Sequence, residues 1–204
     1  MSAQSGAPAK HIVDVLIEER CPHLASTPAW PILRPALHAA LNYRAARDMA
    51  DAIAPLGGAE ALDRVSALLH LKLAPVRAER LPAAGRCVIV CNHPTGIADG
   101  VAIYDLLKTV RDDSVFFANA DALRVCAGFE ETLIPVEWVQ AKRTRERTRV
   151  TLKMTEEAIE AGRPIMIFPA GRLARMRNGL LTDPEWMPTA VSLVSGSIGG
   201  AAGS

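Results

Sequence analysis

A histidine and an aspartate separated by five residues are the side chains of this sequence best suited to acid–base chemistry. His93 follows an apolar run, and Asp99 follows a turn that contains Pro94 and Gly96. An imidazole accepts a proton from a hydroxyl near neutral pH, and a neighbouring carboxylate fixes its tautomer and stabilises the imidazolium. On one continuous helix the two positions would face different directions, so their pairing requires the turn to fold Asp99 back toward the ring.

The same residues also admit a purely structural interpretation. His93 would then bond to backbone in a turn, and Asp99 would be an acid in the first turn of a helix, where the helix dipole favours a negative charge. A zinc site with Cys87 and Cys91 is excluded by distance, because four strand residues span about 13 Å. We expect no bound metal, and we interpret the two cysteines as small buried apolar residues.

The stretch from Asn92 to Asp99 reads Asn-His-Pro-Thr-Gly-Ile-Ala-Asp and resembles the His/Asp box of the glycerolipid acyltransferases, the family that includes lysophosphatidic acid acyltransferases. The five intervening residues are similar to the Pro-x-Gly version found in the haemolysin-like, lipid-linked branch. Two further blocks follow in the family's order, Phe116-Phe-Ala-Asn-Ala120 and Ile167-Phe-Pro-Ala-Gly-Arg-Leu-Ala-Arg175. In the third block, Ala170 and Arg172 stand where the common wording has Glu and Thr.

The resemblance implies transfer of a fatty acyl group from acyl-CoA or acyl carrier protein, as co-substrate, to a lysophospholipid-like acceptor such as 1-acyl-glycerol-3-phosphate. His93 is expected to deprotonate the acceptor and Asp99 to hold the ring, without an acyl-enzyme. The residues that the resemblance places on the substrate are Thr95, Gly96, Asn119, Phe168, Pro169, Gly171 and Arg172. Lysophosphatidate and lyso-ornithine lipid both stay open as acceptors. The alternatives are a non-catalytic lipid-binding module of the membrane surface and a thioester hydrolase.

The elements around these blocks predict an α/β fold. Residues 86–91 are apolar and β-branched, which is typical of a strand buried on both faces. Strand–helix alternation continues to residue 168 and indicates a mostly parallel central sheet flanked by helices. The expected strands are 73–77, 86–91, 114–118, 132–138 and 164–168, and the expected helices are 97–111, 121–126 and 141–161. Because carboxyl ends of parallel strands share one edge, all three blocks should meet there.

Helical periodicity dominates the first part of the chain, at residues 11–20, 35–54 and 59–73. We expect residues 1–71 to form a helical cap packed on the core, in preference to helices lying on a bilayer with Trp30 inserted. Residues 72–194 are expected to form the acyltransferase-like α/β domain, incomplete at its C-terminal end because relatives continue beyond the third block with another strand. Residues 195–204 resemble a low-complexity tail.

The composition of the chain limits the kinds of ligand and the compartment that we expect. The chain has 204 residues, a net charge of +1 and 4% aromatic residues, which argues against nucleic acid as a ligand. Four cysteines and an N-terminus without an apolar core favour a reducing compartment, so we expect a cytoplasmic protein bound peripherally to the cytoplasmic face of a membrane. Arg145, Arg149 and Lys153 share one helix face, which would suit anionic lipid heads, an acidic carrier protein or plain solvation.

Overall fold

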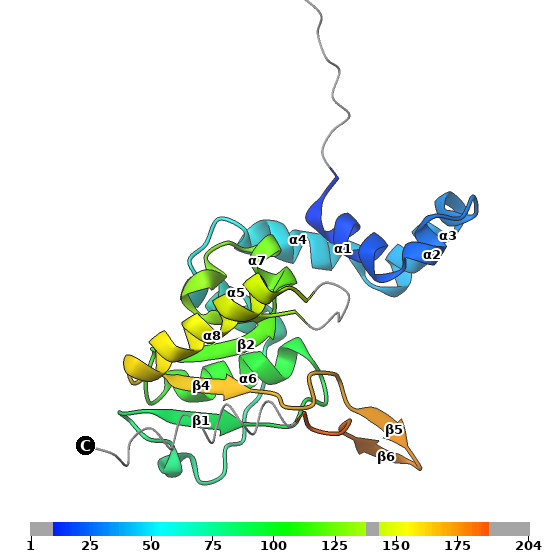
Figure 1. Cartoon of the computed structure of the whole chain (residues 1–204). Helices are drawn as coiled ribbons and strands as arrows, with labels where there is room; N and C mark the ends of the chain where they lie inside the picture. The colour runs from blue at the N-terminus through cyan, green and yellow to red at the C-terminus, as the bar shows by residue number, and fades with distance from the viewer. Residues whose placement is uncertain (1–9, 138–142, 188–204) are drawn as a thin grey trace, which may run out of the picture.

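The centre of the molecule is a four-stranded parallel sheet (Figure 1). The computed structural model describes residues 10–137 and 143–187. The sheet has the order β1-β4-β2-β3 and consists of β1 (Cys87–Val90), β2 (Val115–Asn119), β3 (Leu133–Val136) and β4 (Pro164–Ile167). Every strand pairing is parallel. The predicted α/β fold with a parallel central sheet is confirmed.

Alternating side chains of the strands feed two apolar clusters, one on each face of the sheet. Phe117 and Ile165 belong to the cluster beneath α8 (Arg145–Glu160). The adjacent residues of the same strands, Phe116 and Met166, point to the opposite face. They belong to the cluster shared with α5 (Gly58–Leu69) and α6 (Ile97–Lys108). This period of two is what a strand buried on both faces produces, and the sheet is therefore the middle of three layers.

Five helices precede the sheet and one short helix follows β2. They are α1 (Ile12–Arg20), α2 (Pro22–Ala25), α3 (Trp30–Ala40), α4 (Tyr43–Ile53), α5 and α7 (Asp121–Val125), with single 3₁₀ turns at Ala78–Arg80 and Phe129–Glu131. Ile53, Ala61 and Val65 lie in the same core cluster as the residues of α6. The end of α4 and one face of α5 thus pack on the core of the sheet, while a division of the chain at residue 71 stays a prediction.

Close backbone contact joins the start of α5 to the segment after α7. Gly57 and Gly128 form an isolated bridge. A Cβ atom added to Gly128 would lie 2.2 Å from the carbonyl oxygen of Leu56, which no side chain tolerates. Only glycine permits this approach, and it fixes α5 against the sheet layer.

Two arginines tie together the loops that precede the four strands. Arg111 donates to both carboxylate oxygens of Asp113 at 2.6 Å and to the carbonyls of Gly85 and Gly162 at 2.8 and 3.0 Å. Arg163 donates to the carbonyls of Asp113 and Glu131 at 2.7 and 2.9 Å. The hydrogen bonds from Arg111 hold the pKa of Asp113 below its ordinary value. These contacts brace the amino-terminal edge of the sheet.

Two expectations about strands were wrong. Residues 73–77 form no strand, because Pro75 has no N–H to donate and Arg77 adopts a left-handed conformation at φ 62°. The expectation of a strand buried on both faces was wrong at the end of β1, where Val90 is 39% exposed, although Val88 and Ile89 pack against the two apolar clusters. Pro135 lies in β3, the other edge strand of the described sheet, where a missing N–H is tolerated.

The helical run predicted over 35–54 is two helices. Leu41 and Asn42 separate α3 from α4, and Asn42 has φ 49°, a left-handed conformation that interrupts a helix. A hairpin of β5 (Arg175–Arg177) and β6 (Leu180–Thr182) was not predicted. Among the described residues, no helix combines the length and apolar character needed to span a bilayer. The predictions for Trp138, for the start of a helix at 141 and for the tail 195–204 lie outside the described residues.

Candidate active site

The site begins where the chain leaves β1 and turns into α6. The N–H of Cys91 still bonds to the carbonyl of Ile167 at 3.1 Å, so the ladder between β1 and β4 continues to the turn. Gly96 then adopts φ 87° directly before α6 begins, a conformation that side-chain-bearing residues rarely take. A Cβ atom on Gly96 would lie 3.3 Å from a methyl carbon of Leu173. The glycine is therefore required by both backbone and space.

This turn brings Asp99 back to His93. His93 Nδ1 lies 3.1 Å from Asp99 Oδ2. The same carboxylate accepts hydrogen bonds from the N–H groups of Thr95 and Gly96 at 2.8 and 2.9 Å and from the Thr95 hydroxyl. The two interpretations of the sequence are thus both realised, because Asp99 is an acid at the start of a helix and also the partner of the imidazole.

Two contacts hold the ring of His93, and two hydrogen bonds hold its backbone. Asp99 bonds to one ring nitrogen, and Phe168 from the third block stacks on the ring face, with centroids 4.2 Å apart and an interplanar angle of 22°. The backbone of His93 accepts from the N–H of Ala174 at 2.9 Å and donates to Asp183 at 3.3 Å. The His93 and Asp99 side chains are 19% and 14% exposed. In residues 10–137 and 143–187, Nε2 has no hydrogen-bond partner, so it is the ring nitrogen available to a substrate.

The third block wraps the histidine with a tight loop. Phe168 and Pro169 are buried, and Gly171 turns the chain at φ 59° while its N–H bonds to the carbonyl of Phe168 at 3.0 Å. Arg172 follows this turn and is exposed. Within the described part of the chain its guanidinium makes no ion pair or hydrogen bond, so it is available to an anionic ligand.

Comparison with known proteins identifies the family. A model of the family described as Acyltransferase matches residues 74–194, more than half of the chain and all three blocks. The chain belongs to the glycerolipid acyltransferase family. Over 135 residues it is 31% identical to the lyso-glycine lipid O-acyltransferase of Phocaeicola vulgatus, a match that covers 66% of this chain and 47% of that protein. Over 132 residues it is 30% identical to the protein of the same name from Bacteroides thetaiotaomicron, covering 65% and 47%. The chain spans about half the length of these curated relatives.

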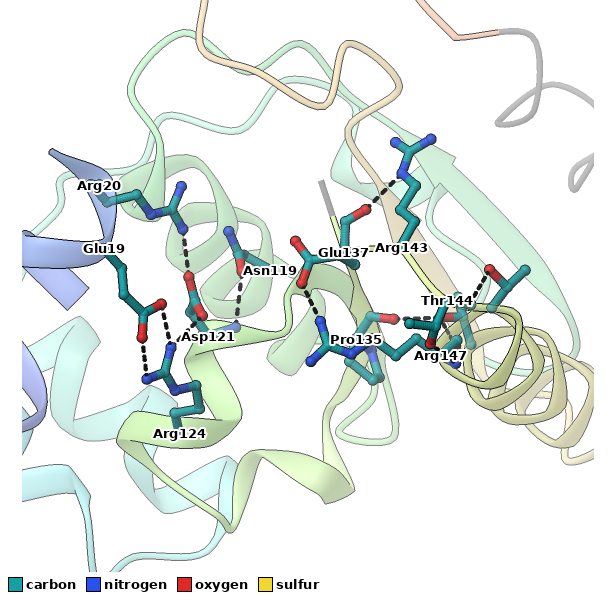
Figure 2. A network of polar contacts seen from close by, with 12 residues as sticks. Glu19, Arg20, Asn119, Asp121, Arg124, Pro135, Glu137, Arg143, Thr144 and Arg147 are labelled. Carbon is teal, nitrogen blue, oxygen red and sulfur yellow. Dashed lines mark hydrogen bonds and ion pairs between the residues drawn. The ribbon is translucent and has the colours of Figure 1, made fainter. Parts of the chain in front are cut away.

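Asn119, the expected substrate residue of the second block, lies in a different set of contacts. Its side-chain oxygen accepts the N–H of Asp121 at 2.9 Å at the start of α7 (Figure 2). Asp121 in turn pairs with Arg20 of α1, and Arg124 pairs with Glu19. No contact joins Asn119 to His93 in the part of the chain that the structure describes. The helix that follows the second block, α7, therefore anchors α1, and a substrate contact of Asn119 stays a prediction.

Thr95 and Gly96 contact Asp99, and their substrate contact likewise stays a prediction. Their N–H groups both bond to the carboxylate, and the N–H of Gly171 bonds within its own turn. The N–H groups of Thr95 and Gly96 are occupied by Asp99 and are therefore not free to stabilise an oxyanion. Their observed contacts orient Asp99.

Sequence reasoning missed two contacts of the site. Asp183 accepts the N–H of His93, and Ala174 donates to its carbonyl. Both residues flank the β5–β6 hairpin, whose turn contains Asn178 and Gly179 at φ 49° and 80°. An Asn-Gly pair between apolar residues is a strong hairpin signal, and it would have placed these segments beside His93.

The basic helix face lies apart from the histidine. A shallow pocket at the start of α8 is lined by Arg143, Thr144, Arg145, Thr148, Arg149 and Leu152, with no residue of the His93 site among them. Arg147 of the same helix pairs with Glu137 (Figure 2). We place the chemistry at His93, because that is where a base and its orienting acid meet.

Cys91 lies next to the pair, and burial, helped by the charge of Asp99, raises the pKa of its thiol. A protonated thiol is a poor nucleophile and a poor metal ligand. Over residues 10–137 and 143–187, no group of three or more His, Cys, Asp or Glu side chains is arranged to hold a metal ion.

Proposed function

We propose that this acyltransferase domain moves a fatty acyl group from a thioester donor to the hydroxyl of a lyso-lipid acceptor, with His93 as general base. The observation that carries the proposal is the 3.1 Å contact between His93 Nδ1 and Asp99. It holds the ring by one nitrogen and leaves Nε2 directed away from the carboxylate. A base oriented in this way suits proton abstraction from a bound alcohol.

The proposed reaction proceeds in one transfer without an acyl-enzyme. Nε2 of His93 takes the proton of the acceptor hydroxyl as its oxygen attacks the thioester carbonyl, and Asp99 stabilises the imidazolium that forms. Collapse of the tetrahedral intermediate breaks the C–S bond, and the departing thiolate takes the proton from the imidazolium. Cys91 is not a nucleophile in this scheme, because burial raises the pKa of its thiol.

For the acceptor, the names of the relatives favour a lyso-glycine lipid over 1-acyl-glycerol-3-phosphate. The transfer to this chain is our proposal, since the match covers 47% of each relative. Arg172, exposed after the turn at Gly171, is proposed to bind an anionic group of the acceptor, because the guanidinium fork suits both carboxylate and phosphate.

The remaining partners follow from this chemistry. The donor is proposed to be acyl-CoA or acyl carrier protein, because both present the acyl group as a thioester. We further propose that the enzyme works on the cytoplasmic face of a membrane, where these donors and a lyso-lipid acceptor meet.

The test is acyl transfer by the purified full chain in detergent, with radiolabelled acyl-CoA and acyl carrier protein as donors. The acceptors are a lyso-glycine lipid, lysophosphatidate and lyso-ornithine lipid, with an acceptor-free reaction as control. Product with a lyso-lipid that disappears in His93→Ala supports the proposal. Thioester cleavage without acceptor would indicate a hydrolase, and bound lipid without product would indicate a binding module; either result rejects it.

A further inference from the structure

The β5–β6 hairpin exposes large apolar side chains on a strand pair that no other described element covers. Met176, Leu180 and Leu181 are 67%, 71% and 54% exposed. All residues of both strands are exposed, and the hairpin extends away from the sheet beyond the arrowheads of β1 and β4 (Figure 1). Solvated strands normally carry polar side chains on the open face, so this composition indicates a partner that takes up apolar groups.

The register of the hairpin gives it one apolar face and one face on which arginines and apolar side chains are mixed. Met176 pairs with Leu181, which gives one face two large apolar side chains. Arg175 and Arg177 occupy the other face, opposite Thr182 and Leu180. Neither arginine has an ion-pair partner within residues 10–137 and 143–187. Apolar groups beside unpaired arginines are the composition of elements that lie in the interface of an anionic bilayer, where the apolar chains enter the acyl region and the arginines meet lipid phosphates.

The hairpin lies directly beside the histidine. Ala174, the residue before β5, donates its N–H to the carbonyl of His93, and Leu173 lies against Gly96. Asp183, the residue after β6, accepts the N–H of His93. Both ends of the hairpin are thus fixed to the backbone of His93, so whatever the hairpin contacts is held close to the proposed base.

We propose that the β5–β6 hairpin is the surface by which this domain contacts an anionic lipid bilayer, and that it sets His93 at the level of the lipid head groups. The proposal rests on the proposed function for the meaning of that position, because a lyso-lipid acceptor lies with its head group at the interface. The apolar face and the arginines act together, so binding should depend on both the leucines and the anionic charge.

The experiment measures co-sedimentation of the purified full chain with two kinds of vesicle, pure phosphatidylcholine and phosphatidylcholine with about one third phosphatidylglycerol. The wild type should bind the anionic vesicles more tightly, and added salt should reduce the difference. Met176→Ser with Leu181→Ser should weaken binding to both vesicles about tenfold. Arg175→Gln with Arg177→Gln should abolish the preference for anionic vesicles while leaving the weaker apolar binding.

Matched controls come from exposed residues elsewhere on the chain. Leu68→Ser with Leu69→Ser alters exposed leucines of α5, and Arg145→Gln with Arg149→Gln removes two arginines of α8. Both control variants should bind as the wild type does. Absence of vesicle binding by the wild type, or equal losses in the hairpin and control variants, would overturn the proposal.

Activity separates this inference from the proposed function. With a water-soluble short-chain lyso-lipid, the Met176/Leu181 variant should turn over as the wild type does, whereas with the acceptor embedded in vesicles its rate should fall about as much as its binding. Unchanged melting temperatures verify that the variants fold. No turnover with any acceptor, alongside hairpin-dependent vesicle binding, would reject the proposed function and leave the hairpin as a membrane contact.

Discussion

Replacing Asp99 with Asn tests the central contact of the site without changing the shape of the side chain. The carboxylate lies 3.1 Å from the ring nitrogen of His93. With an effective dielectric constant of about 20, Coulomb's law gives about 5 kcal/mol between unit charges at that distance. This energy stabilises the imidazolium of the transition state, and each 1.4 kcal/mol corresponds to about a tenfold change in rate. We therefore expect kcat to fall about 10³- to 10⁴-fold.

The Asp99→Asn substitution also changes which tautomer of the His93 ring is favoured. An Asn amide can donate to Nδ1, which places the ring proton on Nε2 and removes the base. Loss of the charged acceptor for two N–H groups at the start of α6 should further lower the stability by about 1 kcal/mol. The assay is initial rate of acyl transfer at saturating donor, together with urea denaturation of the same preparations.

Thr95→Ala is the matched control, because it removes the hydroxyl contact with Asp99 and leaves the contact with His93 intact. We expect it to lose less than about tenfold in kcat. If Asp99→Asn keeps more than about a tenth of the wild-type rate while His93→Ala is inactive, the carboxylate does not support the imidazolium and the reasoning is refuted.

Three further predictions concern the backbone, the pH dependence and the thiol. Gly96→Ala should lower the free energy of unfolding by about 1–2 kcal/mol in urea, because of its φ of 87°; an unchanged midpoint would contradict this. The hydrogen bonds from Arg111 lower the pKa of Asp113, so their stabilisation is complete above the ordinary Asp pKa and disappears as pH falls through the lowered value. The difference in melting temperature between wild type and Asp113→Asn should accordingly shrink from about pH 5 to pH 2, and a constant difference would disprove the linkage. Burial raises the pKa of Cys91, so iodoacetamide should label it slowly at pH 7 and faster above about pH 9 by mass spectrometry; rapid labelling at pH 7 would count against a protonated thiol.

The sheet could be predicted from sequence because its strands are short apolar runs between glycine and proline breaks. The predicted strand 114–118 is shifted by one residue from β2, and the predicted strand 164–168 is one residue longer than β4. Convergence of the first and third blocks followed from parallel strands alone, and the stacking of Phe168 on His93 agrees with it. Periodicity carries this information because both faces of the sheet are covered.

The remaining features depend on contacts that local patterns do not encode. The exposure of Val90 is set by the strand order, which places β1 at an edge. The break at Asn42 comes from a left-handed residue inside a run of helix formers. The ion pairs of Asp121 and Arg124 with Arg20 and Glu19 depend on α1 lying beside α7. The side-chain type predicts a polar role, and only the tertiary arrangement decides its partner.

The contacts that stabilise the sheet and the residues of the candidate site lie at opposite ends of the strands, so substitutions at one end should affect the other little. Arg111 and Arg163 join the loops before the strands, whereas His93 and Arg172 follow the strands at the other end. β1 and β4 are four residues long, about 13 Å, and substitutions that far apart usually act independently. Substitutions around Arg172, the residue proposed to bind the head group, should therefore leave the stability that the arginine links supply unchanged. Directed evolution of acceptor choice should start from variants stabilised at the amino-terminal edge.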